Sequence, residues 1–272
     1  MIKSTTQLTA ITGFPLEHTL SPLLHNTVYD ALGIHAVMLA FPQQDIAAFI
    51  QCMKTMPIQM AAVTIPHKQT IMPLLDSIDP VAKIIGAVNT VIHKNGELIG
   101  YNTDVTGIAA VLKNTPIEGK NILILGAGGA AQPVAYYIQQ HKGNIFCLNR
   151  TYGKSLALVK TFGGKALTKE ELKEQPIDII INTTPVGMGS HEDETPLSKE
   201  YLGAHQTVFD VIYNPLCSKL LKEAAEVGAT TLSGLTMFMA QAYEQIRLWT
   251  EKTIPVELDQ KISRILREQL RG

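Results

Sequence analysis

The sequence predicts an α/β protein of two domains, each built on a sheet that is wholly or mostly parallel. Three observations support this fold class. Short apolar runs alternate with amphipathic segments along most of the chain, which is typical of repeated strand–helix–strand units. A glycine-rich turn stands between an apolar run and a helical segment near the middle of the chain. The 272 residues suit two domains of ordinary size or one large domain.

The first half of the chain begins with this alternation. Apolar runs predict strands at residues 8–11, 35–41 and 60–63. Amphipathic segments predict helices at residues 22–32 and 45–53. Two further runs, at residues 89–93 and 97–101, flank Lys94-Asn95-Gly96. This arrangement predicts a hairpin, because glycine adopts the positive φ of a tight turn without a steric penalty.

The pattern restarts after Pro116 in the second half. A helix predicted at residues 104–112 joins the two halves. Aliphatic runs predict buried strands at residues 121–125, 145–148, 178–182 and 208–212, with helical stretches between them. The last stretch, residues 234–270, has no strand signal. It predicts two helices separated near Pro255, because proline interrupts a helix.

The composition excludes several classes of protein. Lys and Arg number 23 against 24 Asp and Glu, so the formal net charge is −1 and the basic excess of a typical nucleic-acid-binding protein is absent. Hydrophobic residues make up 46% and charged residues 17% of the chain, which argues against a disordered protein. No apolar run approaches the roughly 20 residues that a membrane span requires.

Cysteine usage and the N-terminus predict a cytoplasmic protein. Cys52, Cys147 and Cys217 are scattered without a CxxC pair, so we expect free thiols and no metal site. The first six residues contain no apolar core of a signal peptide. We expect a monomer or a homodimer that binds a small molecule and has neither a nucleic acid nor a membrane as its partner.

The glycine-rich turn predicts a Rossmann-like dinucleotide-binding domain. Directly after the apolar run at residues 121–125 stands the sequence Gly126-Ala127-Gly128-Gly129-Ala130-Ala131, and a helical run follows at residues 133–140. In this G-x-G-x-x-A pattern the first glycine permits a tight turn, and the second lets a pyrophosphate approach the backbone. The small last residue lets helix and strand pack closely. The alternative is a glycine-rich turn without a ligand.

The end of the next strand favours NADP over NAD. An NAD site usually places Asp or Glu there to bind the ribose 2′-hydroxyl. This chain has no carboxylate at that point but has four groups suited to a 2′-phosphate: Asn149, Arg150, Thr151 and Lys154. Charge-assisted hydrogen bonds to phosphate are among the strong ones, so the cluster indicates NADP. The alternative for Arg150 taken alone is an ordinary exposed surface charge.

Three segments of the first half carry many polar side chains: residues 13–26, residues 63–68, and residues 86–90 with 100–104. Thr19 and Ser21 stand where a helix begins, with Pro22 at its first position. Ser21 is either an ordinary N-cap or, with Thr19, part of a carboxylate site. The other two segments, which contain a lysine after a buried strand and two Asn-Thr pairs, are either turns and caps or binding segments.

Together these segments resemble the shikimate dehydrogenase family, which reduces 3-dehydroshikimate with NADPH. The match extends over nearly the whole chain, and its motifs occur in a specific order. The shared motifs lie at residues 18–26 (HTLSPLLHN), 62–68 (AVTIPHK), 86–90 (GAVNT), 100–104 (GYNTD), 126–131, 149–151, 182–188 (NTTPVGM), 210–215 (DVIYNP) and 237–242 (MFMAQA).

The resemblance implies a role for each matching residue. Lys68 and Asp104 would form the catalytic pair. The substrate would bind through its carboxylate to Thr19 and Ser21 and through its hydroxyls to Thr64, Asn89 and Gln241, with Tyr213 nearby. NADP would bind to Gly126, Ala127, Gly128, Gly129, Ala130, Asn149, Arg150, Thr151 and Lys154, and through its nicotinamide half to Thr183, Val211, Gly234 and Met237.

The implied chemistry suits a lysine beside an aspartate. Hydride transfer to a ketone creates an alkoxide, which needs a proton. A lysine side chain is a cation at neutral pH, and a nearby carboxylate favours that charged form. Lys68, held by Asp104, would stabilise the oxyanion and donate the proton during reduction.

The resemblance also implies that the helical tail folds back onto the first domain. The substrate-binding and catalytic domain would then comprise residues 1–104 plus 238–272, and the Rossmann-like NADP-binding domain residues 105–237.

Three positions depart from the family pattern. Thr19 replaces the usual serine and adds a methyl group, Ala62 replaces the usual asparagine, and Ser233 stands where aspartate is common. Because quinate-using relatives vary around Thr19, a quinate/shikimate dehydrogenase with broader substrate use is one alternative. Others are a non-catalytic NADP-binding regulator, against which the intact Lys68 and Asp104 speak, and a folate-linked reductase, against which the carboxylate-binding segment speaks.

Overall fold

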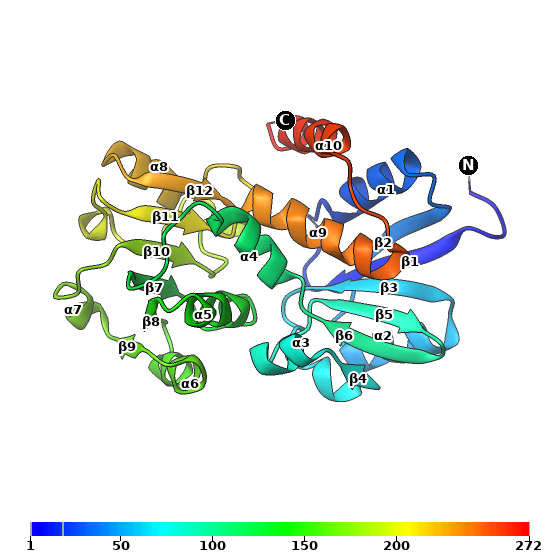
Figure 1. The fold of residues 1–272 in the computed structure, drawn as a ribbon, viewed down its shortest axis with the longest axis horizontal. Coiled ribbons are helices and arrows are strands. Elements are labelled where there is room, and N and C mark those ends of the chain that lie inside the picture. The colour runs from blue at the N-terminus through cyan, green and yellow to red at the C-terminus, as the bar shows by residue number, and fades with distance from the viewer. Residues whose placement is uncertain (1, 18, 272) are drawn as a thin grey trace. The chain divides into compact units, whose positions relative to one another are not determined.

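The computed structural model describes residues 2–17 and 19–271, and the chain divides into two compact units (Figure 1). The first unit comprises Met1–Thr103 and Met239–Gly272, and the second comprises Asp104–Phe238. Each unit contains a six-stranded sheet with helices packed against it, which confirms the predicted α/β class. Within the described residues, every helix is too short or too polar to cross a membrane.

The sheet of the first unit is mostly parallel, as predicted, and it includes an antiparallel hairpin. Its strands, in the order β2-β1-β3-β5-β6-β4, are β1 (Gln7–Gly13), β2 (Ala36–Pro42), β3 (Ile58–Val63), β4 (Ser77–Ile78), β5 (Thr90–Lys94) and β6 (Glu97–Tyr101). β1 is parallel to β2 and β3, and β4 is parallel to β6. β5 is antiparallel to both β3 and β6.

The hairpin of β5 and β6 forms where the sequence predicts it. Lys94 pairs with Glu97, so the turn has only two central residues. Asn95 and Gly96 occupy them with φ of 55° and 84°. Two positive φ angles characterise the type I′ turn, whose twist matches that of the strands, and asparagine followed by glycine is its preferred sequence.

Helices cover the first sheet and build its core. They are α1 (Ser21–Ala31), α2 (Ile46–Thr55), α3 (Pro80–Ile85), the later turns of α9 (Gly234–Thr250) and α10 (Val256–Gln269), with a 3₁₀ turn η1 (Met72–Leu74). Asp45 caps α2, because its carboxylate accepts hydrogen bonds from the N–H groups of Ala47 and Ala48 at 3.0 and 3.1 Å. The apolar face of α2 packs against the strands through Ile46, Phe49, Ile50 and Met53.

The C-terminal helices pack back on the first unit, as predicted. α10 lies against α1, as Figure 1 shows. Trp249 meets Tyr29 edge to face with ring centroids 5.7 Å apart, so this tryptophan belongs to the packing between α9 and α1. The ammonium group of Lys252 donates to the carbonyl oxygen of Leu32 at 2.8 Å.

The second unit has the strand arrangement of a Rossmann-like domain. Its strands, in the order β12-β11-β10-β7-β8-β9, are β7 (Asn121–Leu125), β8 (Asn144–Leu148), β9 (Lys165–Leu167), β10 (Ile179–Asn182), β11 (Thr207–Asp210) and β12 (Thr230–Ser233). All pairings recorded for these strands are parallel. The chain thus starts at the centre with β7, builds outwards to one edge and then to the other, which is the doubly wound order.

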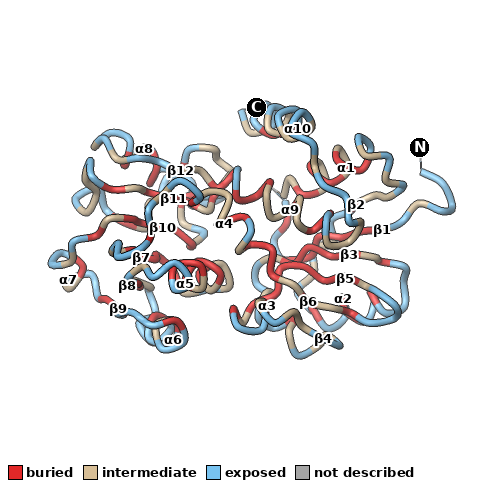
Figure 2. The backbone as a smooth tube through the Cα atoms, viewed as in Figure 1, coloured by how far each residue is buried: buried red, intermediate tan, exposed pale blue. Residues whose placement is uncertain are grey.

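Helices cover the second sheet, and α5 is largely buried (Figure 2). They are α4 (Asp104–Leu112), α5 (Ala131–Gln140), α6 (Tyr152–Phe162), α7 (Lys169–Leu172), α8 (Lys219–Glu226) and the start of α9, with 3₁₀ turns η2 (Gly189–His191) and η3 (Lys199–Tyr201). α4 touches the start of α9: a Cβ on Gly107 would lie 2.6 Å from the carbonyl oxygen of Met237. Glycine is therefore required for this close approach.

Candidate active site

The start of α1 brings two hydroxyl groups together. The Thr19 hydroxyl lies 3.3 Å from that of Ser21 and also accepts the Ser21 N–H at 3.4 Å. Ser21 is the first residue of α1 and Leu20 holds the N-cap position, so the N-cap interpretation of Ser21 is wrong. The hydroxyls instead stand at the positive end of the helix, where a carboxylate is favoured. His18 of the same motif lies outside the described residues.

The turn after β3 holds Thr64 and Lys68. The N–H of Thr64 donates to the carbonyl oxygen of Thr12 at 2.9 Å, and the carbonyl oxygen of Lys68 accepts the N–H of Val88 at 2.7 Å. Between them the buried ring of His67 bonds through Nε2 to the carbonyl oxygen of Gln43 at 2.7 Å. The turn is thus fixed by neighbouring backbone at both ends, and Thr64 and Lys68 are both partly exposed.

Asn89 is the centre of a buried polar cluster. Its Nδ2 donates to Thr103 Oγ1 at 3.0 Å and contacts Gln241 Oε1 at 3.4 Å. Its Oδ1 accepts the Thr90 hydroxyl at 2.8 Å and the Thr103 N–H at 2.7 Å. The structure therefore brings Asn89 together with Gln241 from α9. It also explains the two Asn-Thr pairs, because Thr90 and Thr103 both orient Asn89.

Asp104 and Tyr213 lie in the second unit, whereas Lys68 lies in the first. Asp104 is buried, begins α4 and directly follows Thr103 in the chain. A carboxylate in the first turn of a helix is favoured by the helix dipole. The ring of Tyr213 stacks on Phe238, with centroids 4.3 Å apart and planes inclined by 24°.

The glycine-rich turn connects β7 to α5. Gly126 has φ of 100°, and a Cβ there would lie 2.7 Å from the hydroxyl oxygen of Thr183. A Cβ on Gly128 would meet nothing within 4 Å, so the backbone is open to a ligand at that point. The N-cap residue of α5 is Ala130, whose side chain has no hydrogen-bonding group. The start of α5 therefore suits a bound pyrophosphate, which accepts hydrogen bonds from free N–H groups.

Of the groups expected to hold a 2′-phosphate, Asn149, Arg150 and Thr151 form the turn between β8 and α6, and Lys154 lies in the first turn of α6. Asn149 Nδ2 donates to the carbonyl oxygen of Thr151 at 2.9 Å, and the N–H of Lys154 donates to that same oxygen at 3.0 Å. Arg150, Thr151 and Lys154 are exposed. The structure thus places two cations, a hydroxyl and an amide within residues 149–154, at the start of α6.

The residues expected at the nicotinamide half follow the carboxyl ends of β10 and β11 or begin α9. The Thr183 hydroxyl donates to the carbonyl oxygen of Leu125 at 2.7 Å. Gly234 lies so close to the carbonyl oxygen of Val211 that a Cβ would collide with it. Met237 is buried one turn further along α9. The carboxyl edge of a doubly wound sheet is where nucleotides bind.

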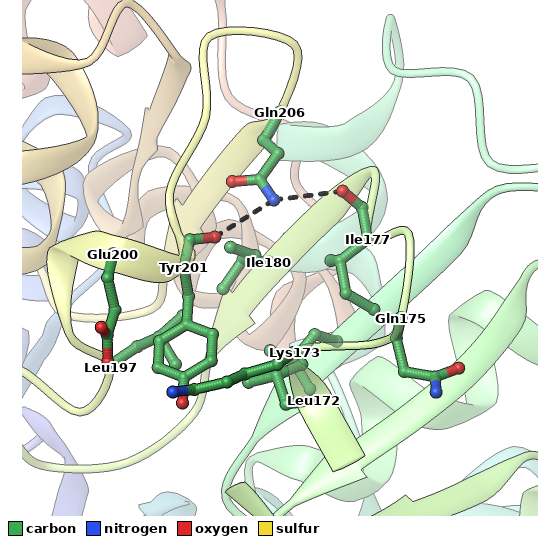
Figure 3. A pocket seen from close by; sticks show the side chains of 10 residues that line it. Leu172, Lys173, Gln175, Ile177, Ile180, Leu197, Glu200, Tyr201 and Gln206 are labelled. Atoms are coloured by element: carbon green, nitrogen blue, oxygen red, sulfur yellow. Dashed lines mark hydrogen bonds between the residues drawn. The ribbon is translucent and has the colours of Figure 1, made fainter. Parts of the chain in front are cut away.

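A cavity of about 320 Å³ lies toward the amino ends of the strands of the second sheet, away from the glycine-rich turn (Figure 3). There Gln206 donates to the carbonyl oxygens of Ile177 and Tyr201 at 3.1 and 3.3 Å. Ile177 and Gln206 precede β10 and β11, whereas the glycine-rich turn follows β7. This cavity is therefore distinct from the nucleotide site.

Asp210 is a buried carboxylate to which the sequence analysis assigns no role. It accepts hydrogen bonds from Asn182 Nδ2 and the Ile212 N–H, both at 3.0 Å, and from the Ser218 hydroxyl at 2.6 Å. It therefore ties the end of β10 to the loop that contains Val211 and Tyr213. Burial raises the pKa of Asp210 to about 6, against the opposing effect of these three donors. In the sequence, the signal that could have pointed to Asp210 is its position at the start of the shared motif at residues 210–215.

Replacing Asp210 with asparagine should flatten the pH dependence of folding stability. The folded-state pKa lies above the ordinary value of 3.8, so the folded protein retains the proton longer than the unfolded chain. Stability therefore falls as the pH rises through this window, by on the order of 3 kcal/mol. Asp210→Asn keeps an acceptor and removes the ionisation. Urea unfolding at pH 4.5 and 7.5 should show a smaller loss in the variant than in the wild type.

Asp178→Asn is the matched control for this measurement. The N–H of Asn121 lowers the pKa of Asp178, so its contribution is lost only as the pH falls below the ordinary range. Its variant should keep the wild-type dependence between pH 4.5 and 7.5. An equal dependence in Asp210→Asn and wild type would contradict the assignment of this titration to Asp210.

Comparison with known proteins identifies the family of the chain. Residues 11–91 match the family described as shikimate dehydrogenase substrate binding domain, and residues 109–189 match shikimate / quinate 5-dehydrogenase. The chain is 40% identical to the shikimate dehydrogenase (NADP(+)) of Oleidesulfovibrio alaskensis, over 92% of this chain and 91% of that protein. It is 35% identical to the bifunctional 3-dehydroquinate dehydratase/shikimate dehydrogenase of Arabidopsis thaliana, over 93% of this chain and 45% of that protein.

Solved structures agree with this assignment. The shikimate 5-dehydrogenase of Thermus thermophilus, solved in complex with NADP(H) and shikimate, superimposes with a TM-score of 0.86 at 30% identity. The match covers 96% of this chain and 99% of that structure. With two matching domains, relatives of similar length and the same fold, the chain belongs to the shikimate dehydrogenase family.

Proposed function

We propose that this protein is an NADP-dependent shikimate dehydrogenase, which reduces 3-dehydroshikimate to shikimate with NADPH and also catalyses the reverse reaction. In this role it would serve the route to chorismate and the aromatic amino acids. The observation that carries the proposal is the cluster of the buried Asn89 and Thr103 with the half-buried Gln241, in the same unit as the paired hydroxyls of Thr19 and Ser21. Amide groups suit the hydroxyls of shikimate, and hydroxyls at a helix start suit its carboxylate.

Each side of the substrate has its own partners in this proposal. Thr19 and Ser21 hold the carboxylate at the start of α1. Thr64, Asn89 and Gln241 hold the ring hydroxyls, and Tyr213 is a further substrate-binding residue. Because a site built for hydroxyls leaves buried groups unpaired when a hydroxyl is missing, such contacts discriminate strongly between analogues.

The second unit suits NADP. The uncapped start of α5 and the open backbone at Gly128 match a pyrophosphate, which Gly126, Ala127, Gly128, Gly129 and Ala130 would bind. Arg150 and Lys154, with Asn149 and Thr151, would bind the 2′-phosphate. The nicotinamide half would be held by Thr183, Val211, Gly234 and Met237. When bound, NADPH supplies the hydride.

The chemistry of the protein itself rests on Lys68 and Asp104. Lys68 binds the ketone oxygen through its ammonium group, which stabilises the negative charge that develops there. It then donates a proton from Nζ to that oxygen, so the ketone becomes an alcohol. Asp104 is the partner of Lys68 in this catalytic pair. In the reverse direction Lys68 accepts the proton.

In the proposed division of labour, residues 1–104 plus 238–272 form the substrate-binding and catalytic domain, and residues 105–237 form the NADP-binding domain. The compact units differ from these bounds by one residue at each junction, because Asp104 and Phe238 belong to the second unit. We further propose a cytoplasmic monomer or homodimer. Its cysteines, Cys52, Cys147 and Cys217, are free thiols, which fits a reducing compartment.

The direct test is product formation. Purified protein mixed with NADPH and 3-dehydroshikimate should consume NADPH, which is followed by its absorbance at about 340 nm, and chromatography should identify shikimate as the product. NADPH consumption without shikimate, or no consumption at all, would contradict the proposal.

A broader quinate/shikimate dehydrogenase is the second candidate. Two observations favour it: the second matching family is described as shikimate / quinate 5-dehydrogenase, and Thr19 carries a methyl group beside the expected carboxylate site. Quinate has an additional hydroxyl on the carbon that carries the carboxylate, so this part of the site decides between them. Comparable rates on quinate and shikimate would establish the broader activity.

A further inference from the structure

A buried polar contact between α1 and α9 in the first unit has no role in the mechanism above. It consists of His25 on α1 and Gln245 on α9, and their exposed fractions are 0% and 1%. Burying polar side chains costs free energy unless their hydrogen bonds are satisfied. His25 and Gln245 lie directly beside residues expected to bind substrate, which makes their hydrogen bonds informative.

The contacts at the two ends of this pair are well defined. His25 Nδ1 donates to the carbonyl oxygen of Ser21 at 2.9 Å. Gln245 is hydrogen-bonded to Gln241 at 2.9 Å, between the Nε2 of one and the Oε1 of the other. The pair therefore connects Ser21 at the start of α1 with Gln241 in the Asn89 cluster.

When Gln245 donates to Gln241, two buried polar atoms between His25 and Gln245 are left without hydrogen bonds. The Gln245 side chain lies within hydrogen-bonding range of the His25 ring. Yet His25 Nε2 and Gln245 Oε1, both buried, have no hydrogen-bond partner among the described residues. Burial lowers the pKa of His25 to about 4, so the ring is neutral near pH 7. With its proton on Nδ1, the Nε2 atom is an acceptor and faces another acceptor.

Reversing two amide groups gives hydrogen-bond partners to His25 Nε2 and Gln245 Oε1. The oxygen and nitrogen of a glutamine amide are nearly indistinguishable in shape, so their placement follows from the hydrogen bonds. With Gln245 reversed, its Nε2 donates to His25 Nε2. Its Oε1 then accepts from the Nε2 of a reversed Gln241. Donation thus runs in one direction, from Gln241 to Gln245 to His25 to the Ser21 carbonyl oxygen.

The reversal changes two contacts between Gln241 and the Asn89 cluster. Gln241 Nε2 then replaces Oε1 at 3.4 Å from Asn89 Nδ2, where neither nitrogen accepts a hydrogen bond, and at 3.5 Å from Thr103 Oγ1. Asn89 Nδ2 keeps its shorter bond of 3.0 Å to Thr103 Oγ1. The Thr103 hydroxyl can accept from the reversed Gln241 while it donates to Asn89 Oδ1 at 3.2 Å.

We propose that His25 and Gln245 are positioning residues that fix the amide of Gln241, so that Gln241 offers its carbonyl oxygen to a donating hydroxyl of the substrate. This inference rests on the proposed function, because Gln241 is expected to bind a shikimate hydroxyl there. Neither His25 nor Gln245 touches the substrate. The direction of their hydrogen bonds decides that Gln241 presents an acceptor, its carbonyl oxygen, and not its amide N–H to the substrate.

Two substitutions at Gln245 test the direction of donation. Gln245→Met keeps the side-chain volume and removes the hydrogen bonds, so KM for shikimate should rise about three- to tenfold, the value of one ordinary hydrogen bond. Gln245→Glu offers only acceptors in its ionised form. It can accept from Gln241 and from a protonated His25, so it should keep KM within about twofold of wild type. In both variants kcat and KM for NADP should stay near wild type.

The opposite direction of donation gives the opposite result. If Gln245 instead donates to Gln241, a glutamate there cannot replace it, and Gln245→Glu should raise KM at least as much as Gln245→Met. That outcome, or an unchanged KM in Gln245→Met, would overturn the proposal. Tyr243→Phe is the matched control, because it removes a hydrogen bond of α9 to Asp259 on α10 and leaves Gln241 untouched.

A spectroscopic measurement tests the connection without enzyme activity. In the wild-type protein labelled with ¹⁵N-histidine, NMR at pH 7 should show His25 as the neutral tautomer protonated on Nδ1, with Nε2 as a hydrogen-bonded acceptor. A doubly protonated ring, or the Nε2-protonated tautomer, would refute the proposal. The result does not depend on turnover, so failure of the proposed function and failure of this connection are separable.

Discussion

Lys68→Ala should lower kcat for the reduction of 3-dehydroshikimate by at least about a hundredfold, the scale of a lost general acid. Without the ammonium group, the developing alkoxide has neither a proton donor nor a compensating charge. The fold should survive the change, because backbone bonds and the ring of His67 hold the turn. Steady-state kinetics together with a thermal melt of the variant check both parts of this expectation.

Lys54→Ala is the control for that experiment. Lys54 lies in the same unit and pairs with Asp76 at 3.0 Å on the surface. Exposed ion pairs contribute little to stability, so this variant should keep both its kcat and its melting temperature near wild type. A Lys68→Ala enzyme that is folded and turns over at nearly the normal rate would remove Lys68 from the mechanism.

Arg150→Ala should raise KM for NADPH by about tenfold or more and leave KM for NADH nearly unchanged. The two cofactors differ only in the 2′-phosphate, so a residue that binds this group distinguishes them. Arg150 is exposed at the start of the turn between β8 and α6, and its removal should not disturb the core. Initial rates with each cofactor, measured at saturating 3-dehydroshikimate, give the comparison.

Salt and a neighbouring lysine provide controls for the cofactor prediction. Because exposed charges are screened, the advantage of wild type over Arg150→Ala should shrink as ionic strength rises. Lys160→Ala, which removes an exposed cation from the last turn of α6, should leave both KM values unchanged. Equal increases of KM for NADPH and NADH in Arg150→Ala would assign Arg150 a role other than binding the phosphate.

Strong local patterns made most of the fold predictable. Aliphatic runs bounded by turns mark β7 and β10 because both strands are buried on both faces. The short strands β4, β9 and β12 were missed. β12 (Thr230–Ser233), for example, is at an edge and half exposed, so it carries no continuous apolar signal. Its place depends on pairing with β11, which is a tertiary contact.

The residues of the candidate site could be predicted from the sequence, but the hydrogen bonds between them could not. The chain order of the motifs points to Asn89 and Gln241, yet they are 152 positions apart and no periodicity shows that they touch. For Ser21 the sequence left two interpretations open: a hydroxyl beside a proline is also typical of an N-cap, but the helix already begins at Ser21. Asp210 and Gln245 owe their importance to burial among specific partners, which single-sequence patterns do not reveal.

The most direct test of the account is a kinetic matrix of shikimate and quinate against NADP and NAD, measured on the wild-type protein. The highest kcat/KM is expected for shikimate with NADP, because the first unit carries the groups suited to the hydroxyls and the carboxylate and the second unit those suited to the 2′-phosphate. With NAD, kcat/KM should be lower mainly because KM for the cofactor is higher. No turnover of shikimate, or a kcat/KM with NAD equal to that with NADP, would contradict it.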